Sequence, residues 1–433
     1  MKFQFKRSRA AAALAIVTVA GLALAGCSTS TSTTSSGLTT DPTQIKGSIT
    51  FSTWWAYANQ KLVDGFSKEY PNVKVKLDFT AIDTYPTKLQ ALASSGDLPD
   101  VFAAQNASLV DLQKAGQLYN LKDALATAPY DGKAKTWGGS FNASLLKGAN
   151  ATLDTSKGET WGVPFNAISV ASIYNKDIFD KVGIKVPTTF AELLSNCTAL
   201  KDAGYIPMSL TGAVWGTWWT SLAWDQTMNG EKVADFSVSD PNYIKGFQIV
   251  QKMAKAGCWT DSQVTTDIAA ETSLFLQKKT AQFVSVPENF LASVVKGADF
   301  KLGTYVLPAL DGKDPNRILG GGNANVLVVN KASKNLSAAV AFAKYLTSTK
   351  VETDLASSQF TIPSLDINLS SGNPLMAAYL EAAGHGFTDS STYLPNFSTA
   401  GYTTYSTEIF PNLVLGKITP EQAAQQTEGL FQK

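Results

Sequence analysis

Histidine and arginine are nearly absent from this sequence of 433 residues. The one histidine, His385, argues against a histidine-rich metal site and against catalysis by a histidine base elsewhere in the chain. Beyond residue 9 the one arginine is Arg317, so the chain lacks the arginine cluster that a strongly charged ligand would need. A net charge of +1 argues against a nucleic-acid-binding protein. We therefore expect no metal, no cofactor and no nucleic-acid partner.

The N-terminus is typical of an export signal. Residues 1–9 are basic, residues 10–25 are apolar, and Leu24-Ala25-Gly26 leads directly to Cys27. This pattern is typical of a secretory signal peptide, and the apolar run is too short for a comfortable membrane span. Leu-Ala-Gly-Cys also resembles the bacterial lipobox, in which the cysteine is lipidated and becomes the first mature residue. The alternative is plain secretion, with cleavage elsewhere and Cys27 incidental.

We accordingly expect a signal peptide over residues 1–26, then a lipidated Cys27 and a tether over residues 27–44. Residues 28–40 are almost entirely serine and threonine, which cannot form a core and read as a flexible segment. Together these features place a folded body outside the cytoplasm, anchored to the cell membrane as a lipoprotein. We expect this body to be a monomer.

Two further cysteines, Cys197 and Cys258, lie in the second half of the chain. A compartment outside the cytoplasm permits their oxidation. A bridge between them would close a loop of about 60 residues and contribute about 4 kcal/mol on the chain-entropy model. The alternative is a pair of buried thiols. We predict the disulfide.

The body alternates between strand and helix patterns. Strands are predicted over residues 47–53, 73–79 and 100–104, which are rich in β-branched or alternating apolar residues. Helices are predicted between them, over residues 59–70 and 85–95. This order is typical of an α/β fold with a largely parallel sheet, whose ligands bind at the carboxyl ends of the strands.

A second group of strand and helix patterns begins near residue 170. In this group too, hydrophobic patterns typical of strands alternate with patterns typical of helices. The arrangement indicates two α/β lobes, with the chain crossing between them. Strands are predicted over residues 170–175, 206–210, 281–286, 305–308 and 326–330, and helices over 190–203, 243–256, 337–347 and 421–431.

Five short segments are spaced along the body in a recognisable order. They are Ile49-Thr50-Phe51 with Trp54-Trp55, Ser95-Gly96-Asp97-Leu98-Pro99-Asp100, Trp161-Gly162-Val163-Pro164-Phe165, Pro187-Thr188-Thr189-Phe190, and Gly320-Gly321-Gly322 before a strand. As an ordered set over residues 45–433, they resemble the extracellular solute-binding proteins of carbohydrate ABC importers, the class typified by maltodextrin-binding protein.

The resemblance implies a two-lobed periplasmic-binding-protein-like fold with a ligand cleft and multiple hinge crossings. By analogy, the N-terminal lobe comprises residues 45–167 plus 322–356, and the C-terminal lobe comprises residues 168–321 plus 357–433. The crossings are expected near residues 166–172, 319–323 and 355–360. Clefts between lobes are common ligand sites, and proteins of this type close them by a hinge.

Aromatic and short polar side chains form the predicted ligand site. Sugar rings stack on indoles, while their hydroxyls need fixed hydrogen-bonding groups. Four of the nine tryptophans form two adjacent pairs, Trp54-Trp55 and Trp218-Trp219, whose members cannot both face one way. We expect at least one of each pair to touch ligand. In the second pair we favour Trp219. The candidates are Trp54, Trp55, Gln105, Asn106, Asn166, Trp215, Trp218, Trp219, Asp225, Glu288, Asn289, Gly321, Gly322 and Asn323.

Three functions fit these observations, and the resemblance favours the first. The first is a protein that captures an extracellular sugar or oligosaccharide by hinge closure and delivers it to an ABC permease, without chemistry. The second is a glycoside hydrolase using two carboxylates such as Asp225 and Glu288, although no paired-carboxylate signature stands out. The third is a binder of a non-sugar neutral solute. Glu288-Asn289 stands where the maltodextrin type has an aromatic, which favours a smaller or more polar saccharide.

Overall fold

The computed structural model describes most of the body. The described residues are 38–55, 57–82, 84–104, 106–167, 171–210, 219–224, 226–227, 238, 240–284, 288–310, 318–320, 325–367, 374–376, 378, 381, 387–389 and 399–431. The predicted signal peptide and Cys27 lie outside them. In the described part, no helix is both long and apolar enough to cross a membrane. Leu38, near the end of the predicted tether, is buried, so the folded body includes residues from Leu38 onward.

Six strands form the first sheet, in the order β11-β4-β10-β3-β1-β2. The strand β1 runs parallel to β2 and β3, as the strand–helix alternation predicted, but β10 runs antiparallel to β3 and β4. The chain enters β10 from a distant segment rather than through a βαβ crossover, so no rule forces it to be parallel. The bounds are β1 (Gly47–Thr53), β2 (Val73–Phe79), β3 (Val101–Ala104), β4 (Gly162–Ala167), β10 (Asn325–Val329) and β11 (Ile362–Pro363).

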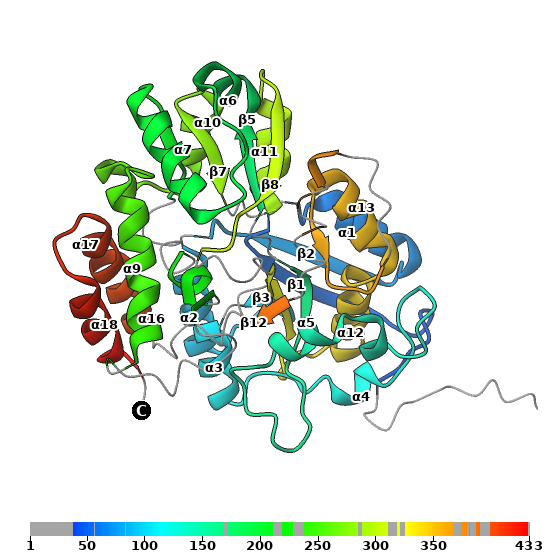
Figure 1. The fold of residues 1–433 in the computed structure, drawn as a ribbon. Coiled ribbons are helices and arrows are strands. Elements are labelled where there is room, and N and C mark those ends of the chain that lie inside the picture. Colours follow the sequence, from blue (N-terminus) through cyan, green and yellow to red (C-terminus); the bar gives the residue numbers. More distant parts are fainter. Residues whose placement is uncertain are drawn as a thin grey trace, which may run out of the picture.

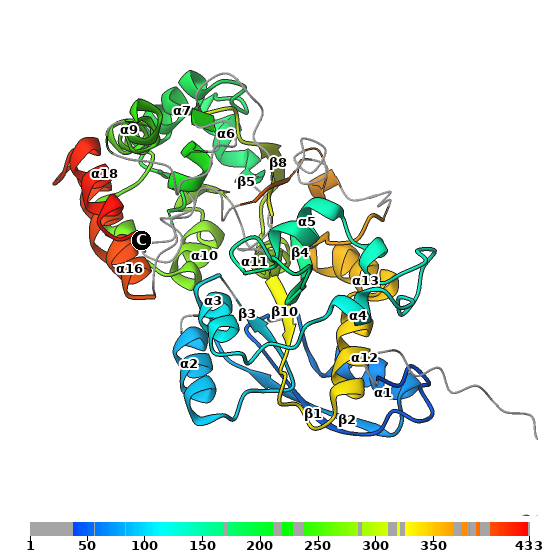
Figure 2. The same ribbon diagram turned by 90° about the horizontal axis from the view of Figure 1, so that it is seen from below.

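Helices cover both faces of this sheet (Figure 2). On one side lie α2 (Tyr85–Ser95) and α3 (Asn106–Lys114), and on the other lie α1 (Gln60–Glu69) and α12 (Leu336–Leu346). Local sequence explains the ends of these helices. The Asn59 side chain caps α1 by accepting from the Leu62 N–H, and Gly96 ends α2 in the left-handed conformation, at φ 80°.

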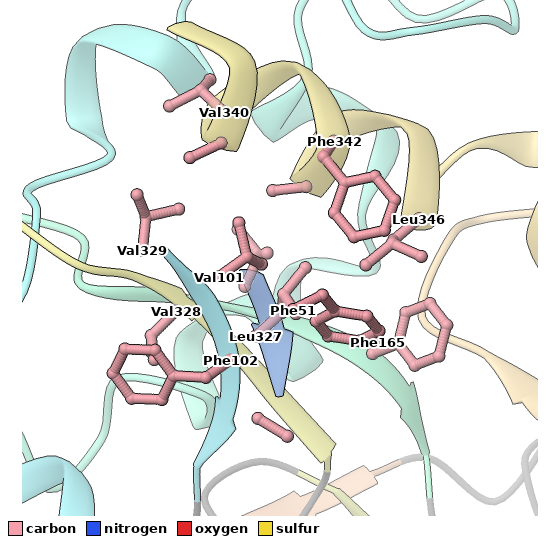
Figure 3. Packing of buried hydrophobic residues seen from close by; sticks show 14 of the residues in the cluster. Phe51, Val101, Phe102, Phe165, Leu327, Val328, Val329, Val340, Phe342 and Leu346 are labelled. Carbon is pink, nitrogen blue, oxygen red and sulfur yellow. The ribbon is translucent and has the colours of Figure 1, made fainter. Parts of the chain in front are cut away.

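The first core lies between the sheet and these helices. Phe51 on β1 meets Phe342 on α12 edge to face, with ring centroids 5.3 Å apart. Figure 3 shows Leu327 from β10 and Phe165 from β4 joining them. Because the central strands are covered on both faces, β3 and β10 are apolar at nearly every position rather than alternating.

Four strands form the second sheet, in the order β6-β7-β5-β8. Only β6 and β7 pair in parallel, while β5 is antiparallel to both β7 and β8. The parallel pairing that residues 47–104 predicted for the first sheet therefore does not extend to most strands of this lobe. The bounds are β5 (Ala171–Asn175), β6 (Ile206–Met208), β7 (Thr280–Val284) and β8 (Leu302–Val306), with helices α6 (Lys176–Val182), α7 (Phe190–Asp202), α9 (Pro241–Lys255), α10 (Ile268–Leu276) and α11 (Glu288–Gly297).

The remaining elements surround the two sheets (Figure 1). The C-terminal helices pack on α9, away from the first sheet. They are α16 (Thr399–Thr404), α17 (Phe410–Val414) and α18 (Pro420–Glu428), with a π-helical turn Tyr405–Ile409. Around the first sheet lie α4 (Lys122–Leu125), α5 (Ala143–Gly148) and α13 (Thr349–Gln359). Short 3₁₀ turns are Gly138–Ser140, Asp261–Thr265 and Pro374–Met376, and β9 (Ile318–Gly320) pairs with β12 (Phe387–Asp389).

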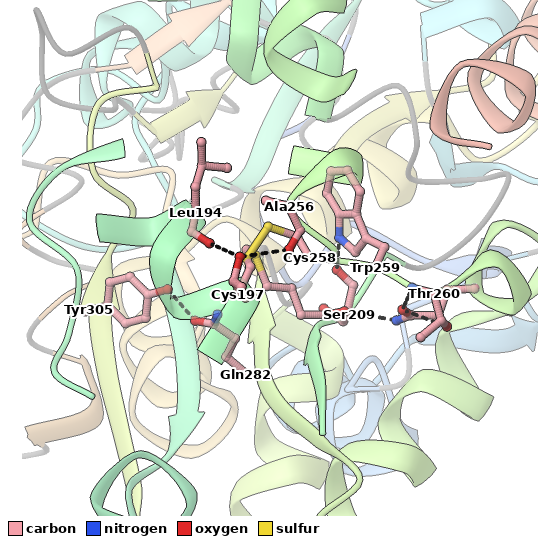
Figure 4. Close-up of a disulfide and its surroundings, with 12 residues drawn as sticks. Leu194, Cys197, Ser209, Ala256, Cys258, Trp259, Thr260, Gln282 and Tyr305 are labelled. Atoms are coloured by element: carbon pink, nitrogen blue, oxygen red, sulfur yellow. Dashed lines mark hydrogen bonds between the residues drawn. A yellow bond between two sulfur atoms is a disulfide. The ribbon is translucent and has the colours of Figure 1, made fainter. Parts of the chain in front are cut away.

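A disulfide joins Cys197 on α7 to Cys258, just after α9 (Figure 4). Both residues are fully buried in the hydrophobic core formed by the second sheet and its helices, which we call the second core. The predicted bridge is therefore present, and it joins α7 to the segment just after α9 across a sequence separation of 61.

Three strands from distant segments meet where the two sheets adjoin. The strands β4, β10 and β11 are neighbours in the first sheet, and β4 leads towards β5 of the second. Near β11 the chain alternates between the cores: Leu355 belongs to the first, Phe360 and Ile362 to the second, and Leu365 to the first again. We call residues 355–365 the crossing segment.

Candidate functional site

The two tryptophans after β1 point to different neighbours. Trp55 stacks on Phe165, with centroids 4.6 Å apart and planes 15° apart. Trp54 meets Tyr85 edge to face, with centroids 4.9 Å apart. As expected for adjacent residues, the pair does not share one direction. Both side chains are at least nine-tenths buried, so the structure packs them into the carboxyl edge of the first sheet.

Trp55 has one polar atom, and that atom has no partner among the described residues. Its Nε1 is buried without a hydrogen bond, and the side chain is 1% exposed. A buried donor without an acceptor costs about 1–3 kcal/mol, so such groups usually have a role or an unseen partner. Among the described residues, this donor therefore remains available to an acceptor at the carboxyl edge.

A neutral polar network lies beside this aromatic stack. The Asn166 Nδ2 donates to the Tyr57 Oη at 2.7 Å, and the Asn325 Nδ2 donates to the Asn166 Oδ1 at 2.6 Å. All three side chains are buried, and the Tyr57 ring stacks at 5.9 Å from Phe165. The network therefore combines hydroxyl and amide groups with an aromatic wall. We call Trp55, Tyr57, Phe165, Asn166 and Asn325 the edge cluster.

Strand order explains why these distant residues meet. Asn166 is near the carboxyl end of β4, and Asn325 begins β10. Because the two strands are antiparallel, the start of one lies beside the end of the other, and Asn325 pairs directly with Asn166. An irregularity in register follows at Asn325–Val326. Such irregularities redirect side chains at functional edges.

Sequence reasoning missed Tyr57 and Asn325. A signal for Asn325 existed, since it lies two positions after the predicted Asn323 and alternate residues of a strand share a face. Tyr57 stands in the loop just after the tryptophan pair, where aromatic residues are dense. In each case the signal was a position two residues after a predicted site residue, which is Trp55 for Tyr57 and Asn323 for Asn325.

The neighbouring strand β2 ends in one exposed aromatic and one closed ion pair. Phe79, which pairs in register with Thr53 at the end of β1, is 53% exposed. Beside it, the Lys88 Nζ lies 2.6 Å from the Asp78 carboxylate and donates to the Thr80 Oγ1 at 2.8 Å. Burial acts to raise the pKa of Asp78, but the hydrogen bonds from Lys88 and Ser52 outweigh it and hold that pKa below its usual value. Lys88 is therefore already neutralised by a carboxylate.

The second predicted tryptophan pair is described in part. Trp219 is 4% exposed and packs edge to face on Trp259, at 5.0 Å, within the second core. Its role as a ligand platform stays a prediction. The side chains of the other candidates lie outside the described residues: Gln105, Asn106, Trp215, Trp218, Asp225, Glu288, Asn289, Gly321, Gly322 and Asn323. The backbone of Asn106 begins α3, and Glu288 and Asn289 begin α11.

A cavity of 610 Å³ lies elsewhere, along the free edge of β8. Its lining includes Tyr174, Lys176 and Thr188 from the second lobe and Leu375 beyond the crossing segment. It contains none of the predicted site residues. Among the described residues, no group of three histidine, cysteine or acidic side chains is placed to hold a metal ion.

Comparison with known families identifies the class of protein. Residues 48–353 match the family of bacterial extracellular solute-binding proteins, and the chain belongs to this family. This confirms the family expected from the ordered segments.

Particular relatives refine this placement. The chain is 25% identical over 356 residues to the sn-glycerol-3-phosphate-binding periplasmic protein UgpB of Agrobacterium fabrum, which covers 78% of this chain and 77% of the relative. It is 28% identical over 377 residues to the diacetylchitobiose binding protein DasA of Streptomyces coelicolor, covering 83% and 82%.

Solved structures agree on the fold. A chitin oligosaccharide binding protein matches with a TM-score of 0.73 and 20% identity, covering 89% of this chain and 98% of the other. A solute-binding protein in complex with raffinose matches with a TM-score of 0.66 and 18% identity, covering 89% and 99%. The chain thus has the two-lobed α/β fold of solute-binding proteins, as predicted.

Proposed function

We propose that this protein is the solute-binding component of an ABC importer, and that its ligand is a neutral sugar or oligosaccharide. The observation that carries the proposal is the edge cluster. It joins a stack of aromatic rings to a network of uncharged hydroxyl and amide groups at the carboxyl edge of the first sheet. Apolar ring faces and hydroxyl-directed hydrogen bonds are the two features that a saccharide presents.

A neutral ligand fits the charges better than an anionic one. The relatives are named for ligands of both kinds: anionic sn-glycerol-3-phosphate and neutral diacetylchitobiose. An anion would favour arginine, which the body has once, at Arg317. Lys88 is the lysine of α2, and it is paired with Asp78. The unpartnered Trp55 N–H is a neutral donor, suited to a hydroxyl or ether oxygen.

The binding cycle follows from the fold. We infer that the two lobes close on the ligand about the adjacent strands β4, β10 and β11. The lobes are residues 45–167 plus 322–356 and residues 168–321 plus 357–433. The closed protein then presents the sugar intact to a membrane permease. The sequence pattern at Cys27 supports a lipid anchor that holds the mature protein at the cell membrane. The protein acts as a monomer. The ligand residues predicted just after β1, on β4 and in the second tryptophan pair stay candidates in this scheme.

Titration of the mature body, beginning after Cys27, tests the proposal. Heat and tryptophan emission are followed against a panel of mono- and oligosaccharides, and the recovered sugar is checked by chromatography. We expect saturable binding of at least one sugar, recovered uncleaved. Cleaved sugar would indicate a hydrolase, and silence against the whole panel would remove the carbohydrate assignment.

Matched variants connect binding to the edge cluster. Trp55→Ala removes the stacking ring and the free donor, and we expect at least a tenfold loss of affinity. Trp161→Ala is the control, because Trp161 immediately precedes β4, at the opposite edge of the same sheet, and donates its Nε1–H to the Asp154 carbonyl. Equal losses in both variants would show that general damage, rather than the edge cluster, controls binding.

A further inference from the structure

A buried carboxyl group fastens the crossing segment to the first lobe. Glu352, on α13, is 2% exposed. Its Oε2 accepts hydrogen bonds from the backbone N–H of Ser364, at 2.7 Å, and of Leu365, at 3.2 Å. The Ser364 Oγ lies 2.6 Å from its Oε1. A carboxyl is costly to bury, so one side chain that binds three groups just after β11 marks a specific structural demand.

The segment that Glu352 holds is under backbone strain. Phe360, between α13 and β11, has φ 60°, in the left-handed region that non-glycine residues rarely adopt. Such a conformation is energetically unfavourable and persists only where surrounding contacts enforce it. The side chain of Phe360 lies in the second core, while Leu355 and Leu365 on either side lie in the first. The chain therefore reaches across and returns within eleven residues, 355–365, and Glu352 fixes the return.

Strand β11, in which the crossing segment returns towards the first lobe, is paired with the candidate ligand site. In β11, Ile362 pairs with Ala167 and Pro363 pairs with Asn166. Asn166 is the centre of the edge cluster, bonded to both Tyr57 and Asn325. A displacement of Ser364 would therefore move the strand against which Asn166 is aligned.

We propose that Glu352 is a positioning residue for ligand capture: by holding Ser364 and Leu365 it sets the register of the crossing segment against β4, and with it the geometry of the edge cluster and the angle between the lobes. This inference rests on the proposed function. Glu352 does not touch the ligand; it acts through β11 and Asn166.

The protonation of the carboxyl selects the informative substitutions. Burial raises the pKa of Glu352 to about 8, so near neutral pH the group is largely a neutral acid. Glutamine has the same shape, with an oxygen for the two backbone N–H groups and an N–H for the Ser364 hydroxyl. Glu352→Gln should therefore keep all three hydrogen bonds, Ser364→Ala should keep two, and Glu352→Ala should keep none. Asp354→Asn, an exposed carboxyl on the same helix, is the matched control.

The experiment measures affinity and lobe geometry on the same proteins. Labels at Ser95→Cys on α2 and Lys252→Cys on α9, both exposed positions in different lobes, report the interlobe distance with and without the best sugar of the panel. We expect Glu352→Ala to weaken binding at least tenfold and to change the interlobe distance of the unliganded protein. We expect Ser364→Ala to weaken binding about fivefold, as for the loss of one hydrogen bond. Glu352→Gln and Asp354→Asn should stay within threefold of the parent.

Other outcomes are equally clear. A Glu352→Ala protein that melts earlier but keeps its affinity and its interlobe distance would overturn the inference, because Glu352 would then be structural only. If Glu352→Ala does not fold, Ser364→Ala decides, and an unchanged affinity and distance in that variant would contradict the proposal. If the parent binds no sugar, the proposed function fails, while the distance in the unliganded variants still tests the positioning role.

Discussion

The disulfide offers a stability prediction whose size can be worked from the structure. It closes a loop over a sequence separation of 61 between two buried cysteines. On the chain-entropy model a loop of this length contributes about 4 kcal/mol to the free energy of unfolding. For a lobe of about 200 residues, this corresponds to a melting temperature about 10 °C higher than that of the reduced protein.

Thermal unfolding with and without reductant measures this contribution. We expect the parent protein to lose about 10 °C under reductant strong enough to open a buried bond. A variant carrying Cys197→Ala and Cys258→Ala should melt at the reduced parent's temperature and should not respond to reductant. A parent protein that melts identically in both conditions, with two free thiols found after denaturation without reductant, would refute the reasoning.

Three further predictions use other parts of the fold. Gly246→Ala on α9 places a Cβ 2.3 Å from the Trp224 ring, so unfolding by denaturant should show a loss of about 1–3 kcal/mol, against little change for the exposed Lys252→Ala. Burial, together with the nearby charge of Asp131, raises the pKa of Glu352 from 4.5 to about 8. The contribution of Glu352 to stability is therefore present below pH 4.5 and is lost as the pH rises through 8. In unfolding curves taken across this pH range, Glu352→Gln should flatten that loss of stability. Phe79→Ala removes the exposed aromatic side chain at the end of β2, beside β1. Calorimetry should then show a larger loss of affinity for long oligosaccharides than for monosaccharides. Equal losses for both would place Phe79 outside the site.

Periodicity predicted the local elements well because their residues face simple environments. The first strand was expected over residues 47–53 and β1 is Gly47–Thr53, and the helix expected over residues 85–95 is α2, which ends at Gly96. In each case the signal is local: a short run rich in β-branched residues for the strand, and a glycine at a left-handed position for the end of the helix. Strand direction was harder to predict. The antiparallel pairing of β10 depends on where the chain returns from the other lobe, and no residue of Asn325–Val329 encodes that path.

The candidate site shows the same limit. Trp54 and Trp55 were chosen because they follow a predicted strand, and Asn166 because it lies at an expected crossing between the lobes. The structure brings all three to one edge of the first sheet. Tyr57 and Asn325 were missed, since their importance arises from the contact between β4 and β10 rather than from a local pattern. Glu352 was also invisible to sequence reasoning. A lone glutamate in an amphipathic helix reads as a solvent-exposed residue until the fold places the crossing segment over it.

The most direct test of the central claim is a calorimetric titration of the mature body with two kinds of ligand under identical conditions. One kind is a series of neutral oligosaccharides, and the other is sn-glycerol-3-phosphate. Because the edge cluster is uncharged and Lys88 is paired with Asp78, we predict saturable binding within the saccharide series and no measurable heat with the phosphate. Saturable binding of glycerol-3-phosphate, with no response to any saccharide, would contradict the account.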